Sequence, residues 1–312
     1  MESKENNFAS AIIYVHNAED RIESFLGIII SLMQNNFEHS EIICVNDCSD
    51  DRSVELIKRC CDKAISTSVS IVNMSHFHGL ELSMDAGMEL SIGDYVFEFD
   101  NTLMDFDADV VMKVYRHSLE GFDIVSASPD RKSKLSSRLF YRVFDKFSDN
   151  SYQMTTESFR VLSRRVINRI STMNKTIPYR KVVYANSGLK TDNIKYIPTN
   201  FSCGLSDEKE SEYRKGLAMD TLILFTGLGY SFAKSMTVLM MLISVFMVFY
   251  AVLIFLTGHP VEGWTTTILF LAVAFFGLFG ILTIIIKYLQ LIVNLVFKRK
   301  QYNYESIEKL TR

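Results

Sequence analysis

Two long runs without charged residues dominate the second half of the chain. Residues 236–256 and 265–286 contain no Asp, Glu, Lys, Arg or His. Each run has about twenty residues, and an α-helix of that length spans roughly 30 Å, the thickness of the hydrocarbon core of a bilayer. A helix buried in a soluble core would be shorter or interrupted by polar positions. The sequence therefore predicts two transmembrane helices, which form a hairpin over residues 236–286.

The segments around this hairpin predict its orientation. The connection over residues 257–264 contains helix-breaking Gly and Pro and ends at Trp264, a residue typical of the boundary between lipid and water. Lysine and arginine lie outside the hairpin, and the connection has neither. They are Arg214, Lys215 and Lys234 before it, and Lys287, Lys298, Arg299 and Lys300 after it. Because basic residues favour the cytoplasmic side, both ends of the hairpin are predicted to face the cytoplasm.

Other features of the sequence argue against several classes of protein. Residues 1–7 include no apolar segment, so no signal peptide is predicted. The five cysteines form no CxxC pair and fall on the predicted reducing side of the membrane, which argues against disulfides and zinc sites. A formal net charge of -3 argues against nucleic-acid binding. Two spans without an intramembrane charge offer no pathway for a channel or transporter.

Strand-length apolar runs alternate with helical patterns over the first hundred residues. This alternation predicts an α/β fold with a mostly parallel, doubly wound sheet, since crossover helices join neighbouring parallel strands. The predicted strands are residues 11–15, 41–45, 69–74 and 95–99, and the predicted helices between them are residues 20–35, 52–64 and 79–90.

The segment up to residue 210 continues less regularly. It predicts a helix over 107–119, a strand over 122–127, a helix over 135–147, and a strand and a helix within 157–170. We assign residues 1–210 to one domain. Residues 211–235 are predicted to form an amphipathic segment in the membrane interface, and residues 287–312 a juxtamembrane cytoplasmic tail.

Polar residues follow several of the predicted strands. Asn17 follows the first strand, Asn46, Asp47 and Ser49 follow the second, and Asp100 follows the fourth. Ligands of a doubly wound sheet bind beyond the carboxyl ends of its strands, so these side chains predict a binding site. The same side chains could instead cap the helices that follow. Spacing alone leaves both interpretations open.

A series of short motifs occurs in one order along the chain. They are Ile12-Ile-Tyr-Val-His-Asn-Ala-Glu19, Asn46-Asp-Cys-Ser-Asp-Asp-Arg-Ser53, the segments from Gly79 to Gly87 and from Gly93 to Asp105, Gly121-Phe-Asp-Ile-Val-Ser-Ala-Ser128 with Arg131, and Ser158-Phe-Arg-Val-Leu-Ser-Arg164. With the C-terminal hairpin, this order resembles the family-2 glycosyltransferases of GT-A fold, in the branch of dolichyl-phosphate mannose synthases and bacterial polyprenyl-phosphate glycosyltransferases. The resemblance extends over nearly the whole chain.

The resemblance implies a membrane-anchored, inverting enzyme of a bacterial inner membrane. It would move a sugar from a nucleotide-diphosphate sugar to undecaprenyl or dolichyl phosphate at the cytoplasmic face, and act as a homo-oligomer such as a tetramer. By this resemblance the catalytic residues are Asp100 and Asp105, the donor-binding residues are Asn17, Asn46, Asp47, Ser49, Arg131, Arg160 and Arg164, and the lipid-phosphate ligands are Arg214 and Lys215. Planar guanidinium groups suit phosphates.

The metal-binding motif of this family is altered here. The family reads "DADLQD", whose aspartates hold Mg²⁺ or Mn²⁺, whereas this chain reads Asp100-Asn-Thr-Leu-Met-Asp105. Thr102 replaces the second aspartate and Met104 the glutamine, and a hydroxyl and a thioether are poor ligands for these cations. The alternative interpretation is therefore a catalytically impaired relative that serves as a binding or scaffold subunit of a glycan-assembly complex.

Overall fold

The computed structural model describes residues 4–130, 157–172, 180–185, 187–199 and 302–311, and scattered residues from 216 to 292. The chain divides into two compact units: one holds residues 1–142, 150–217 and 300–312, and the other holds residues 143–149 and 218–299. The helix predicted over 135–147, nearly all of the segment 211–235 and most of both predicted spans lie outside the described residues. Within the described part of the chain, no helix has the length and apolarity needed to cross a bilayer.

The described residues of the first unit form one eight-stranded sheet in the order β7-β5-β6-β4-β1-β2-β3-β8. Strands β4, β1, β2 and β3 are parallel, whereas β6 and β8 run antiparallel to their neighbours. The predicted mostly parallel α/β sheet is thus confirmed. The strands are β1 Ala9–Val15, β2 Ser40–Asn46, β3 Thr67–Met74, β4 Tyr95–Phe99, β5 Ile124–Pro129, β6 Phe159–Ser163, β7 Thr191–Tyr196 and β8 Tyr304–Lys309.

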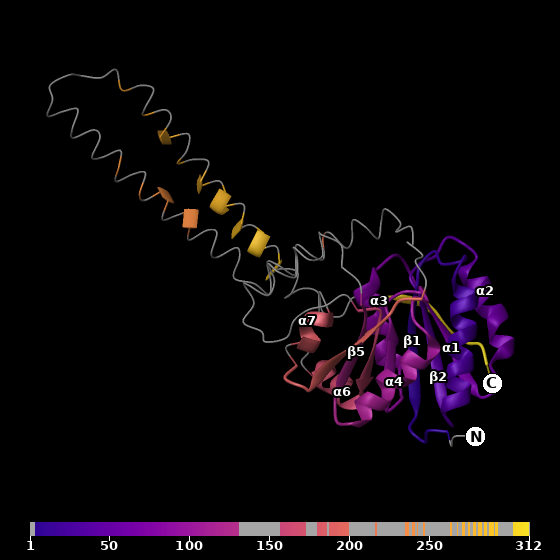
Figure 1. The fold of residues 1–312 in the computed structure, drawn as a ribbon. Coiled ribbons are helices and arrows are strands. Elements are labelled where there is room, and N and C mark those ends of the chain that lie inside the picture. The colour runs from indigo at the N-terminus through magenta and orange to yellow at the C-terminus, as the bar shows by residue number, and fades with distance from the viewer. Residues whose placement is uncertain are drawn as a thin grey trace. The chain divides into compact units, whose positions relative to one another are not determined.

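Helices cover both faces of this sheet (Figure 1). The two faces carry separate apolar cores because successive residues of a strand point to opposite sides: Ile13 of β1 packs into the core under α1, α2 and α4, and Ile12 into the core under α3, α6 and α7. The helices are α1 Ile22–Asn36, α2 Ser53–Cys60, α3 Leu80–Leu90, α4 Ala108–Leu119, α6 Arg164–Thr172 and α7 Arg180–Ala185, with a 3₁₀ turn at Cys61–Lys63.

Two glycines explain how α3 reaches its place against β1 and β2. Gly79, at the start of the helix, has φ +82°, a conformation that costs little only for glycine. Gly87 lies so close to the sheet that a Cβ atom there would be 2.6 Å from Ile12 Cγ2 and 2.8 Å from Val45 Cγ2. The pair of glycines in the Gly79–Gly87 motif is therefore a backbone requirement of the fold.

Strand β8 is an element that the sequence analysis missed. Its residues fall in the segment predicted as a juxtamembrane tail, yet they pair antiparallel with β3 at the edge of the sheet. Glu308 Oε2 of β8 lies 2.6 Å from Lys58 Nζ of α2, which fixes the strand further. The sequence Tyr-Glu-Ser-Ile-Glu-Lys is mostly exposed and charged, as edge strands often are, so it carries no strong apolar signal.

Candidate active site

The carboxyl ends of β4, β1 and β2 are adjacent, because these three strands are parallel neighbours. Asp100 follows β4 and Asn17 lies two residues beyond the end of β1, while Asn46 ends β2 and Asp47 follows it. The structure therefore brings the predicted site residues of the first hundred positions to one edge of the sheet, as the sequence analysis expected.

The loops after β1 and β2 are joined by hydrogen bonds. The Asn17 side-chain oxygen accepts from the Asp50 N–H at 2.9 Å, and the Asn17 N–H donates to Ser49 Oγ at 3.1 Å. Ser49 is held in turn, since its N–H donates to Asn46 Oδ1 at 3.1 Å. Asn17, at φ 44°, and Cys48, at φ 55°, adopt the left-handed conformation that this arrangement requires. The two loops thus form one rigid surface.

We expect Cys48→Gly to stabilise the protein by up to about 1 kcal/mol. A left-handed backbone costs a non-glycine residue about 1–2 kcal/mol, and the greater freedom of glycine in the unfolded chain offsets part of this. Cys48→Ala keeps the Cβ atom and is the matched control, for which no gain is expected. Chemical denaturation compares the three proteins, and a glycine variant less stable than the alanine variant would contradict the expectation.

Asp47 connects these loops to the start of α3. Its carboxylate is fully buried and accepts three hydrogen bonds: Oδ1 from the His78 N–H at 2.8 Å, and Oδ2 from the Gly79 N–H at 2.8 Å and from Tyr14 Oη at 3.0 Å. Predicted as a donor-binding residue, Asp47 thus holds the backbone at the beginning of the helix.

Asn46 is linked to the C-terminal strand. Its Nδ2 donates to Asn73 Oδ1 of β3 at 3.0 Å, and Asn73 Nδ2 donates to Ser306 Oγ of β8 at 2.9 Å. The N–H of Asn303, just before β8, donates to His78 Nε2 at 3.2 Å. Residues at the far end of the chain therefore help to position the loop after β2.

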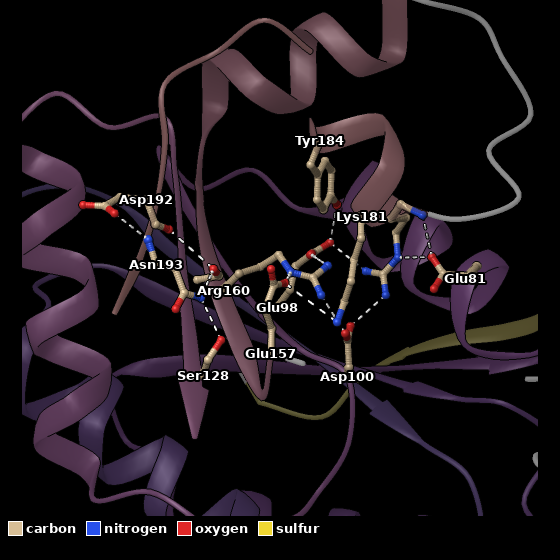
Figure 2. Close-up of polar contacts among 12 residues, drawn as sticks. Glu81, Glu98, Asp100, Ser128, Glu157, Arg160, Lys181, Tyr184, Asp192 and Asn193 are labelled. Atoms are coloured by element: carbon tan, nitrogen blue, oxygen red, sulfur yellow. Dashed lines mark hydrogen bonds and ion pairs between the residues drawn. The ribbon is translucent and has the colours of Figure 1, made fainter. Parts of the chain in front are cut away.

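The end of β4 carries a buried cluster of ion pairs, drawn in Figure 2. Arg160 of β6 and Arg180 of α7 each bridge Glu98 and Asp100, at 2.9 and 2.7 Å from Arg160 and at 2.8 and 2.7 Å from Arg180. Each Nε binds a further carboxylate, that of Glu157 at 3.2 Å for Arg160 and that of Glu81 at 2.9 Å for Arg180. We call these six residues the arginine–carboxylate cluster.

This cluster keeps Asp100 ionised. Both arginines are 1% exposed and Glu98 is fully buried. Burial alone would raise the pKa of the Asp100 carboxyl, but the charges of Arg160, Arg180 and Lys181 outweigh it and hold that pKa well below its ordinary value. Asp100 is consequently an anion whose two carboxylate oxygens each accept a hydrogen bond from a guanidinium.

The sequence analysis placed Asp100 and Arg160 in the site but missed Glu81, Glu157 and Arg180. Glu98 lies two residues before Asp100 on β4, and hence on the same face of the strand, next to Arg160 in the strand register. This two-residue spacing is enough to predict from the sequence that Glu98 lies beside Asp100. No comparable signal marks Arg180, which comes from a short helix that the sequence pattern does not predict.

The remaining predicted residues do not all join this group. Asp105 is buried and accepts from Tyr196 Oη at 2.7 Å. Arg164 lies at the opposite end of β4, where its Nε donates to the Gly93 carbonyl oxygen at 2.8 Å, because β6 runs antiparallel and carries the residue away from Asp100. Arg131, Arg214 and Lys215 lie outside the described residues.

The described residues do not fit the divalent cation of the family. Both oxygens of Asp100 accept from arginines at 2.7 Å, and Thr102 presents a buried hydroxyl where the motif has a carboxylate. Across the ranges that the structure describes, no three His, Cys, Asp or Glu side chains are arranged to hold a metal ion. The groups that bind Asp100 are guanidiniums, and together they form an ion-pair network.

Comparisons with solved structures support the fold. The chain resembles glucosyl-3-phosphoglycerate synthase from Mycobacterium tuberculosis, solved in complex with Mn²⁺, uridine diphosphate and glucosyl-3-phosphoglycerate, with a TM-score of 0.51 and 15% identity over 71% of this chain and 80% of that one. Another structure of that synthase gives a TM-score of 0.50 at 16% identity, covering 71% of this chain and 81% of the other. The predicted GT-A fold is thereby confirmed.

Comparisons of sequence give the family. The uncharacterized glycosyltransferase YkcC of Bacillus subtilis is 24% identical over 83% of this chain and 81% of its own length. A bactoprenol glucosyl transferase of Shigella phage SfX is 24% identical over 63% of this chain and 66% of its own. An undecaprenyl-phosphate 4-deoxy-4-formamido-L-arabinose transferase of Edwardsiella ictaluri is 25% identical over 38% and 36%. The model of glycosyl transferase family 2 matches residues 10–171, so this chain belongs to that family and is a glycosyltransferase.

Proposed function

We propose that this glycosyltransferase moves a sugar from a nucleotide-sugar to polyprenyl phosphate at the cytoplasmic face of a bacterial membrane. The relatives named as bactoprenol glucosyl and undecaprenyl-phosphate transferases support the acceptor. The observation that carries the proposal is the single polar edge at the carboxyl ends of β4, β1 and β2, where a nucleotide-sugar can lie across the loops.

The position of β8 supports the predicted hairpin. The chain leaves the sheet after β7 and returns to the same sheet at β8, so any segment in between that crosses a bilayer must do so an even number of times. Two spans, 236–256 and 265–286, satisfy this condition. Within the second unit, the Met240 side chain approaches Gly277 too closely for a Cβ atom there, as expected for two helices packed through a small residue.

In the proposed reaction an oxygen of the lipid phosphate attacks the anomeric carbon and the nucleoside diphosphate leaves, with inversion. The attacking oxygen is already anionic near neutral pH, so the protein needs no strong general base. It must align the two substrates and supply positive charge to the leaving diphosphate. The rigid loops after β1 and β2 and the ordered end of β4 are suited to that alignment.

An assay of the purified full chain tests this function. In detergent with polyprenyl phosphate and a panel of labelled nucleotide-sugars, we expect label to enter the lipid with at least one donor. The Asp100→Asn variant keeps the side-chain shape and removes the charge at the strand end, and we expect it to be at least about 100-fold slower, as for loss of an electrostatic group in an active site.

The rival function, a binding or scaffold subunit, is favoured by the altered motif at Thr102. Titration calorimetry with the same nucleotide-sugars distinguishes the two. A protein that binds a donor but transfers nothing would support the rival, and a protein that forms lipid-linked sugar would exclude it.

A further inference from the structure

Both carboxylate oxygens of Asp100 accept a hydrogen bond from an arginine of the arginine–carboxylate cluster. Each Asp100 oxygen accepts a charge-assisted hydrogen bond at 2.7 Å, and both guanidinium groups are buried with every nitrogen bound to a carboxylate. Each oxygen keeps a second lone pair, but a cation bound there would lie beside two guanidinium charges, or would have to displace these bonds and leave two buried guanidiniums without one of their partners. Loss of a partner is strongly unfavourable for a buried ion.

The arginines themselves are not available to a substrate for the same reason. Their two charges face the four carboxylates of Glu81, Glu98, Asp100 and Glu157, and each arginine side chain is 1% exposed. A nucleoside diphosphate bound at this edge must therefore find its positive charge in another residue.

Lys181 is such a residue. It follows Arg180 directly on α7, so the helix that anchors the cluster also fixes the lysine backbone. Its side chain is 13% exposed, and among the described residues its ammonium pairs with Glu157 at 3.9 Å, a separation too long for a hydrogen bond. Figure 2 draws Lys181 beside Asp100, in agreement with its electrostatic effect on that carboxylate.

We propose that the cluster excludes the divalent cation of the family from Asp100, and that Lys181 takes over its role by binding the diphosphate of the donor at the end of β4. A lysine ammonium carries three donors on a flexible stem and can turn from Glu157 toward a phosphate. Asp100 then orients the arginines and the lysine, and binds no metal. This inference rests on the proposed transfer from a nucleotide-sugar.

The first experiment measures the metal dependence of the purified full chain. Transfer in EDTA is expected to equal transfer in Mn²⁺ within about twofold. A Mn²⁺ titration followed by electron paramagnetic resonance, with uridine diphosphate present, is expected to show no bound ion that Asp100→Asn removes. Transfer that requires Mn²⁺, or binding lost in Asp100→Asn, would overturn the inference and leave the proposed function intact. If no sugar is transferred from any nucleotide-sugar, the proposed function fails. The Mn²⁺ titration alone then decides whether Asp100 binds metal.

The second experiment tests Lys181. Lys181→Ala is expected to lower kcat about 100-fold, as loss of a charge that stabilises a leaving group does, with the KM for the lipid acceptor unchanged. It is also expected to weaken nucleoside diphosphate binding about tenfold in calorimetry. Lys181→Arg should recover most of both. The control is Lys190→Ala, which removes an exposed lysine just before β7 and should leave both unchanged. Transfer and binding by Lys181→Ala within threefold of the unmodified chain would refute the assignment.

Discussion

Replacing Glu98 with alanine is expected to destabilise the protein by about 3–5 kcal/mol, the range found when one partner of a buried ion pair is removed. Glu98 is fully buried and accepts from Arg160 at 2.9 Å, from Arg180 at 2.8 Å and from Tyr184 Oη at 2.8 Å. Alanine leaves two buried guanidinium nitrogens without acceptors, and leaves the Tyr184 hydroxyl with only the weak acceptor Met88 Sδ at 3.5 Å. Each arginine would then keep two of its three carboxylate partners, Asp100 and Glu157 for Arg160, and Asp100 and Glu81 for Arg180.

Chemical denaturation of the full chain in detergent measures this effect. The matched control is Glu55→Ala, because Glu55 pairs with Arg59 at 3.2 Å on the surface of α2, where both side chains are more than 60% exposed. Exposed pairs of this spacing contribute under about 0.5 kcal/mol. A Glu98 variant no less stable than the Glu55 variant would show that the cluster relaxes around the missing carboxylate.

The sequence predicted the first half of the sheet well because its signals are local. In β1, Ile12 and Ile13 are both apolar and point to opposite cores, as in a strand covered by helices on both faces. The polar residues after β1, β2 and β4 meet for a topological reason alone, since neighbouring parallel strands end at the same edge. Neither inference needs knowledge of distant contacts.

The parts that could not be predicted depend on distant pairings. Arg180 and Glu98 are 82 positions apart in the chain and meet only because α7 packs near β4. Arg160 and Arg164 look alike in the motif, yet a strand of five residues that runs antiparallel to β4 carries them to opposite ends of it. The strand β8 pairs with β3 across more than two hundred residues, and its own sequence carries little apolar signal.

Asp47 has two interpretations that a pair of variants can separate. By resemblance it binds the donor, whereas the structure uses its carboxylate to hold the Tyr14 hydroxyl and the N–H groups of His78 and Gly79. Asp47→Ala is expected to destabilise the protein by about 3 kcal/mol or more, since two buried N–H groups lose a charged acceptor and each such group costs about 1–3 kcal/mol. Asp47→Asn retains one side-chain oxygen and should lose less.

The effect of Asp47 on catalysis is expected to travel through α3. The carboxylate fixes the start of this helix at Gly79. Two residues further, Glu81 binds Arg180 at 2.9 Å, and Arg180 in turn holds Asp100 at 2.7 Å. Tyr14→Phe is the matched control, because it removes one hydrogen bond to Asp47 and leaves both N–H groups of the helix start bound. It is expected to lose about 1 kcal/mol of stability and little transfer activity. Denaturation and the lipid transfer assay are run on Asp47→Ala, Asp47→Asn and Tyr14→Phe. Stability and activity should fall in the same order, because the contact of Asp47 with the start of α3 supports both. An Asp47→Asn protein of unchanged stability that no longer binds a nucleotide-sugar would instead make this carboxylate a direct ligand of the donor.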